Sequence, residues 1–309
     1  MRRIAPIAAL IALLSMNACQ QQAAAPATPT PESQPTVPVA ASLDPNAATA
    51  ASADPNAILT SVPASAADFL ARAVAYINRG NAEAALADIE AALAADANYA
   101  PAYYWRGVLN FATNNEQALN DFNRAISLDP KNAEYYHWRG RVYSWIDQVD
   151  AALADYTQAI TLNPVRADFY FWRGAAYAFR QDQPPAIADY TKAIELDPTR
   201  ADYYHWRAMA LTASGQTDLA IADHARAIER SPDTAEYYYE RGMTYTARGN
   251  IDLALIDFTR AIDLDATKEK YFYQRGLAFK ALGNAEAARV DFQHSVELGG
   301  EAAKTELGQ

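Results

Sequence analysis

The sequence is poor in the residues that most often carry chemistry. It has 309 residues but only one cysteine and four histidines. A single cysteine excludes an internal disulfide and a thiolate zinc site. The sequence also contains no Gly-rich phosphate-binding loop, no Gly-x-Ser-x-Gly motif and no His-Glu-x-x-His motif. It therefore predicts a protein that is not an enzyme and that needs no cofactor or metal.

Positive charge and long apolar runs are also scarce. The formal net charge is −11, whereas a general nucleic-acid binder needs a basic surface, so no nucleic-acid partner is predicted. Beyond the N-terminus there is no stretch of 18 apolar residues, so no ordinary membrane-spanning helix is expected.

The first residues are typical of an export signal. Arg2 and Arg3 precede an apolar run from Ile4 to Leu14, and small or polar residues lead to Cys19. Residues 1–18 therefore predict a signal peptide. The segment resembles a bacterial lipoprotein signal, although Met16 stands where leucine is more usual. The resemblance implies that Cys19 carries lipid and anchors the chain to the outer membrane, facing the periplasm. The alternative is plain secretion, which leaves a periplasmic or secreted protein.

Residues 19–64 predict a disordered tether. They are rich in Ala, Pro, Ser, Thr and Gln, and residues 20–64 contain no aromatic residue. Such a composition cannot bury enough apolar surface to order itself. The segment is therefore expected to be semi-extended.

The remainder of the chain is built from one repeated pattern. EYYHWRGRVY at 134–143 recurs as DFYFWRGAAY at 168–177 and DYYHWRAMAL at 202–211, at intervals of 34 residues. The full set of frames is 66–99, 100–132, 133–166, 167–200, 201–234, 235–268 and 269–302, which leaves a short C-terminal tail at 303–309. Below, positions 1 to 34 refer to places within a frame. Small residues at positions 8 and 20 and prolines at position 32 predict two closely packed helices, A and B, in each frame.

This pattern resembles the tetratricopeptide repeat (TPR) family, which shares its period and signature. The resemblance implies an all-α fold, an α-solenoid in which seven helix-turn-helix repeats form a right-handed superhelix. It also implies that helix A lines a concave face through positions 2, 5, 6, 9 and 12 or 13.

An arginine at position 7 and an aspartate at position 23 occur in all seven frames. The first lies on helix A and the second on helix B. We expect partly buried ion pairs that set the register between the two helices more than they add stability. In the central frames these pairs are Arg139 with Asp155, Arg173 with Asp189, and Arg207 with Asp223.

Aromatic residues concentrate on the expected concave face. The predicted groove for a partner comprises Trp105, Trp138, Trp172 and Trp206 at position 6, Tyr104, His137, Phe171, His205 and Tyr239 at position 5, and Glu134, Asp168, Asp202 and Glu236 at position 2. Such aromatics often dominate binding, and the acidic edge favours a basic ligand. Alternatively, the rings only pack between neighbouring helices A.

Together these features predict a protein–protein interaction scaffold of the cell envelope that binds an extended segment of a protein partner. Its contact with the membrane is expected only through the N-terminal lipid. Two alternatives stay open: a glycan-binding module, because Trp and Tyr faces also stack on sugars, and a purely structural spacer.

Overall fold

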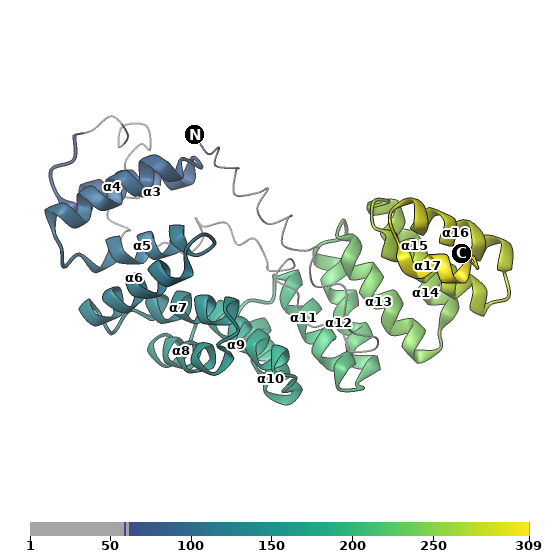
Figure 1. Cartoon of the computed structure of the whole chain (residues 1–309). Coiled ribbons are helices and arrows are strands. Elements are labelled where there is room, and N and C mark those ends of the chain that lie inside the picture. The colour runs from purple at the N-terminus through teal and green to yellow at the C-terminus, as the bar shows by residue number, and fades with distance from the viewer. Residues whose placement is uncertain (1–58, 60–61, 309) are drawn as a thin grey trace. The chain divides into compact units, whose positions relative to one another are not determined.

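Every regular element that the structure describes is a helix. The computed structural model describes residue 59 and residues 62–308. Fifteen α-helices, α3 to α17 in Figure 1, make up this part of the chain, and no β-strand occurs within it. The predicted signal peptide, Cys19 and nearly all of the predicted tether lie outside the described residues.

The chain forms two compact units, which divide between Arg180 and Gln181. The boundary lies in the fourth frame, between its two helices. The first unit holds α3 (Ala66–Asn78), α4 (Ala82–Ala95), α5 (Ala100–Asn110), α6 (Asn115–Leu128), α7 (Ala133–Trp145), α8 (Val149–Leu162) and α9 (Ala167–Phe179). The second holds α10 (Gln183–Leu196), α11 (Ala201–Ala213), α12 (Thr217–Arg230), α13 (Ala235–Arg248), α14 (Ile251–Leu264), α15 (Glu269–Ala281), α16 (Ala285–Glu297) and α17 (Glu301–Glu306).

Each helix A begins at the first residue of its predicted frame, and local hydrogen bonds explain why the preceding helix B stops. Asp129, at the end of α6, accepts a hydrogen bond from the backbone N–H of Lys131 at 3.2 Å. Pro130 lies inside this Asx turn. Because proline has no backbone N–H to donate, the helix cannot continue through it. The Tyr136 hydroxyl then donates to the Pro130 carbonyl at 3.2 Å. Equivalent tyrosine bonds start from Tyr103, Tyr170, Tyr204 and Tyr238.

In the repeats that lie within one unit, the core depends on a close fit between positions 8 and 24. A Cβ atom added to Gly140 would lie 2.9 Å from the Tyr156 ring, and one added to Gly242 would lie 2.7 Å from the Phe258 ring. Within each unit, the repeats that have alanine at position 8 carry a residue other than Phe or Tyr at position 24. These pairs are Ala73 with Ile89 and Ala208 with His224. The two positions therefore share one fixed volume between the helices.

This fit predicts the effect of one methyl group. Gly140→Ala is expected to destabilise the first unit, because overpacking costs about 1–3 kcal/mol whereas the better helix propensity of alanine returns at most about 1 kcal/mol. Adding Tyr156→His, which copies the Ala208 and His224 combination, should restore much of the loss. Urea denaturation followed by far-UV circular dichroism measures both effects. An unchanged midpoint for Gly140→Ala would show that the ring moves aside freely.

The C-terminal tail closes the last repeat with a short helix. Ala303 of α17 is fully buried and packs in one cluster with Ala288 and Phe292 of α16. Lys280 also forms an ion pair with Glu306. The tail therefore covers part of the last apolar face, within the two helical turns that its length allows.

Candidate functional site

Arginine and aspartate side chains tie helix A to helix B in repeat after repeat. In the third repeat, Arg139 donates from Nε and Nη2 to the two carboxylate oxygens of Asp155, at 2.8 and 2.7 Å. In the fifth, Arg207 binds Asp223 in the same way, at 2.6 and 2.8 Å. The same pairing occurs in Arg72–Asp88, Arg106–Asp121, Arg241–Asp257 and Arg275–Asp291. The predicted pair Arg173 with Asp189 has one member in each unit and stays a prediction.

These pairs are structural. The aspartates are buried, and each arginine also stands over the aromatic ring at position 4 of its own helix, as Arg139 does over Tyr136 with Cζ 5.6 Å from the ring centroid. The hydrogen bonds to Asp155 raise the pKa of Arg139, even though burial opposes the charge. With both partners satisfied inside the repeat, neither side chain is available to a ligand.

The aromatic residues at position 5 do not line an open wall. The Tyr104 ring lies 5.4 Å from that of Tyr135, and the His137 ring lies 5.0 Å from that of Phe169. In the second unit, His205 contacts Tyr237 at 4.9 Å and Tyr239 contacts Tyr271 at 5.0 Å. In each case position 5 meets position 3 of the next repeat. Tyr104, His137, His205 and Tyr239 are buried in these inter-repeat contacts, and Phe171 is buried as well, so position 5 does not present an open surface.

The tryptophans at position 6 differ from the expected continuous stripe. Trp105, Trp172 and Trp206 are only 2–8% exposed, whereas Trp138 is half-buried. A helix face of about 100° contains both the contact with the next helix and the free surface. Periodicity alone cannot divide one from the other. Only Trp138, of the four, keeps an accessible ring.

The acidic residues at position 2 form ion pairs within the chain. Arg166 forms ion pairs with Glu134 at 2.9 Å and Asp168 at 3.8 Å. Asp202 and Glu236, in the second unit, bind Arg200 at 2.6 Å and Lys270 at 2.8 Å. Three cations thus face four carboxylates, so most of this negative charge is offset within the chain. The preference for a basic ligand stays a prediction.

One cluster in the first unit stays accessible and includes a cation. We call Phe111, Trp138, Arg141, Trp145 and Trp172 the aromatic cluster. Its rings come from the end of α5 and from α7 and α9. The Phe111 ring lies 5.9 Å from those of both Trp138 and Trp145. All of its members except Trp172 are half-buried.

Arg141, Phe111 and Trp145 were not among the predicted site residues, although their positions, 9 and 12 or 13, were expected to line the concave face. Arg141 stands at position 9, which is apolar in the other six repeats: Val74, Val108, Ala175, Met209, Met243 and Leu277. A comparison of the repeats position by position would have found this exception. Phe111 and Trp145 stand at positions 12 and 13 of their frames, at the end of helix A, where the resemblance also placed the concave face.

The second unit contains a half-buried carboxylate, Glu240, with a raised pKa. Burial, followed by the nearby charge of Glu236, raises the pKa of Glu240 to about 7. Lys270 binds Glu236 and stands 4.5 Å from the centroid of the Tyr239 ring. The Tyr271 hydroxyl donates to the same carboxylate at 2.9 Å. Glu236 and Lys270 thus form a closed network within the unit.

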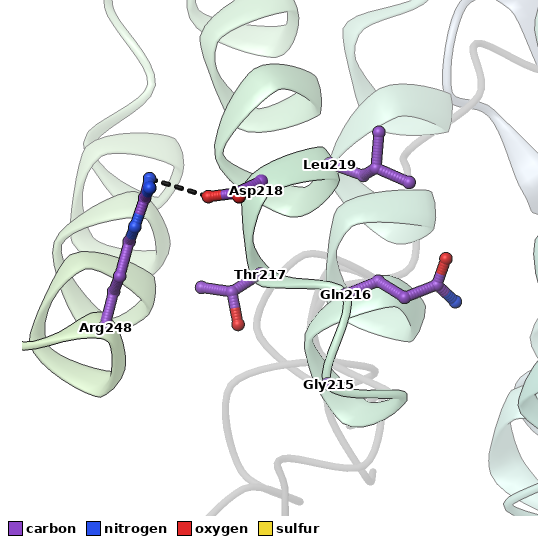
Figure 2. Close-up of a pocket in the computed structure, with 6 residues that line it drawn as sticks. All are labelled: Gly215, Gln216, Thr217, Asp218, Leu219 and Arg248. Carbon is purple, nitrogen blue, oxygen red and sulfur yellow. Dashed lines mark ion pairs between the residues drawn. The ribbon is translucent and has the colours of Figure 1, made fainter.

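A shallow pocket in the second unit lies where helix A turns into helix B. It is lined by Gly215, Gln216, Thr217, Asp218, Leu219 and Arg248. Figure 2 shows Arg248 reaching Asp218, with Nη1 and Oδ1 2.7 Å apart. Both partners are well exposed, so the pair is worth under about 1 kcal/mol. The pocket presents no set of groups suited to catalysis.

The histidines are not placed to hold a metal. The rings of His205 and His224 lie 5.5 Å apart, but both are buried, and both nitrogens of His224 lack a hydrogen-bond partner. Within the described part of the chain, no group of three His, Cys, Asp or Glu residues is arranged to bind a metal ion. None of the helices in residues 62–308 has the length and hydrophobicity needed to cross a bilayer.

Solved structures with the same fold are numerous. The pilus biogenesis factor PilW matches with a TM-score of 0.61 and 21% identity, over 67% of this chain and 98% of its own. YrrB, described as a TPR protein with an unusual peptide-binding site, matches with a TM-score of 0.52 and 23% identity, over 61% and 98%. A tetratricopeptide repeat protein from Parabacteroides merdae matches with a TM-score of 0.58 and 20% identity, over 78% and 96%. No curated protein matches the chain in sequence.

Family profiles match most of the repeat region. A profile described as TPR repeat matches residues 114–144. Profiles described as tetratricopeptide repeat match residues 147–201 and 207–269, residues 189–222, and residues 269–298. These matches agree with the paired helices, the small residues at positions 8 and 20 and the regular helix starts. The chain belongs to the tetratricopeptide repeat family.

Proposed function

We propose that the chain is a non-enzymatic scaffold that binds an extended segment of a partner protein at the aromatic cluster. The observation that supports this site most strongly is the half-exposed face of Phe111, Trp138 and Trp145, since large rigid aromatics supply much of the energy at protein interfaces. YrrB, a protein of the same fold, is described by its peptide-binding site. The other aromatic residues of the predicted groove serve as packing residues of the repeats.

We further propose that this scaffold works in the cell envelope. The proposal is based on the predicted signal peptide and on Cys19, which would carry the lipid and face the periplasm from the outer membrane. PilW, which shares the fold, is a type IV pilus biogenesis factor. Metabolic labelling with a radioactive fatty acid tests the anchor. Label is expected in the wild-type chain and not in Cys19→Ser, whereas an unlabelled wild-type chain would favour plain secretion.

The binding site is tested by photocrosslinking in cells. A photoreactive phenylalanine analogue placed at Trp145 should form a discrete adduct with a partner protein. The same analogue at Leu86, an exposed residue on α4, serves as the matched control and should form none. Trp138→Ala in the same chain should weaken the adduct at least about ten-fold, because the truncation of a buried aromatic anchor costs 2 kcal/mol or more at many interfaces.

The two other functions predict different results. A glycan-binding module would sediment with purified cell-wall sacculi, lose this sedimentation in Trp138→Ala and form no protein adduct. A structural spacer would give no adduct at Trp145 and would tolerate Trp138→Ala without loss of function. Equal adducts at Trp145 and Leu86 would mean that the crosslinks are unspecific, which would contradict the proposed site.

A further inference from the structure

Arg141 is an arginine whose guanidinium lies against three aromatic rings. Its Cζ atom lies 4.2 Å from the centroid of Trp138 and 4.7 Å from that of Trp172, two rings that come from neighbouring repeats. The Phe111 ring approaches to 5.2 Å. Stacking of this kind favours a guanidinium over other cations and holds its plane in one orientation.

This arginine has no anion within the described part of the chain. No ion pair or hydrogen bond from Arg141 is found among those residues, and its Nε is buried without a partner. The contrast with Arg139, two residues earlier, is direct, because Arg139 binds both oxygens of Asp155. The carboxylates of Glu134 and Asp168 raise the pKa of Arg141 through their charge but form their ion pairs with Arg166.

The ring contacts do not supply a hydrogen-bond acceptor for the guanidinium of Arg141. A guanidinium carries five N–H donors that all point outward in its own plane. The donor on Nε of Arg141 is buried and has no acceptor. A buried or half-buried donor without an acceptor costs free energy, and the cost is greater for a charged group. Burial also lowers the pKa of Arg141, which reflects how poorly its charge is solvated.

A purely structural role explains less. A residue that only joins Trp138 to Trp172 needs no charge, and methionine serves at the same position in the fifth and sixth repeats as Met209 and Met243. An arginine there keeps a planar donor array in a partly dry, aromatic setting. In such a setting a charge-assisted hydrogen bond to a carboxylate is stronger than in water.

We propose that Arg141 is the receptor for a carboxylate of the bound segment, with the rings of the aromatic cluster contacting the apolar residues on either side of it. The proposal builds on the proposed function and names the partner chemistry: an extended peptide with an acidic residue between apolar ones. Because Glu134 and Asp168 share Arg166, the nearby groups carry one excess negative charge, so recognition of a carboxylate must come from direct contact with Arg141. The carboxylate comes from an Asp or Glu side chain or from the end of a chain.

Two display libraries of random 12-residue peptides distinguish these sources. In one the peptide C-terminus is fused to the display protein and therefore blocked, and in the other it is free. Both are selected on the full chain and on Arg141→Met, which keeps an apolar stem between the rings. We expect the blocked library to yield a motif with an invariant Asp or Glu on the wild type and no acidic preference on Arg141→Met.

The best peptide then enters a double-mutant cycle. Replacing its acidic residue by the amide should weaken binding to the wild type by about 10- to 100-fold, since hydrogen bonds to charged groups contribute about 1.5–3 kcal/mol. The same replacement should leave binding to Arg141→Met unchanged. Circular dichroism must show that the variant is folded. Arg141→Lys should restore only part of the affinity, because an ammonium lacks the planar fork.

Each other outcome has a defined meaning. Enrichment only from the free-end library would support the carboxylate receptor with a chain terminus as its source. Peptides without an acidic residue, or an acidic preference that persists on Arg141→Met, would show that Arg141 is structural while the scaffold function stands. Failure of both libraries to yield any binder on the wild type would contradict the proposed function itself.

Discussion

Acidification from pH 7 to pH 4 is expected to destabilise the second unit by about 3 kcal/mol or more through its buried histidines. Burial lowers the pKa of His205 from 6.5 to about 4, with Lys270 lowering it further and Glu236 opposing the shift. Burial, followed by the charges of His205 and Arg241, lowers the pKa of His224 well below 6.5. Both rings are therefore neutral in the folded protein.

The direction of this effect follows from proton linkage. In the unfolded chain these histidines take up protons as the pH falls through about 6.5, whereas in the folded chain they resist protonation. Their contribution to stability is complete above that value. For His205 it is lost as the pH falls towards about 4, where its folded form begins to titrate. Protonation of both rings, 5.5 Å apart, would add repulsion between like charges.

A variant of the fifth repeat that copies residues of the sixth tests whether His205 and His224 cause the acid sensitivity. There, positions 5, 8 and 24 are Tyr239, Gly242 and Phe258. The triple variant His205→Tyr, Ala208→Gly, His224→Phe should fold in the same way and lose about 3 kcal/mol less than the wild type between pH 7 and pH 4. The change from Ala208 is needed because the Phe258 ring leaves no room for a Cβ atom at Gly242.

Urea denaturation at several pH values, combined with hydrogen exchange that resolves the two units, provides the measurement, because repeat arrays need not unfold in a single step. His294→Gln is the matched control. His294 is half exposed, and its variant should follow the wild type. An equal loss of stability in the wild type and the triple variant would assign the acid sensitivity to carboxylates.

Removal of one aspartate from the repeated ion pairs is expected to lower the free energy of unfolding by a similar amount. Asp257 is buried and accepts two hydrogen bonds from Arg241, both 2.8 Å long. Asp257→Ala leaves the guanidinium of Arg241, whose side chain is only 20% exposed, without an anion. A loss of about 3 kcal/mol is expected, since breaking a buried pair from one side costs about 3–5 kcal/mol.

Replacement of both partners should be much milder. In Arg241→Met with Asp257→Leu, no charge remains buried, and such exchanges are often close to neutral. The exposed pair Arg248 with Asp218 provides the control, because Asp218→Ala should cost less than about 1 kcal/mol. Urea denaturation midpoints of the wild type, Asp257→Ala, the double variant and Asp218→Ala measure these differences in stability. If Asp257→Ala destabilised the protein no more than Asp218→Ala does, the repeated Arg–Asp pairs would contribute little to stability, which would contradict the prediction.

The local repeat architecture followed from the sequence alone. The 34-residue period predicted where each helix A begins, from Ala66 to Glu269. The pairing of position 7 with position 23 was also predictable, because the two residues are 15 or 16 apart within one helical hairpin. Short-range geometry of this kind is the same in every repeat and needs no knowledge of the neighbours.

Only the tertiary structure decided which side chains a partner can reach. Positions 5 and 6 lie on the same helical face in sequence, yet the structure buries Tyr104 against the next repeat and leaves Trp138 half-exposed. It likewise places Arg141 between rings from two repeats and pairs Glu134 with Arg166. These outcomes depend on the spacing and rotation of adjacent repeats and on side-chain rotamers, which a periodic pattern within one repeat does not encode.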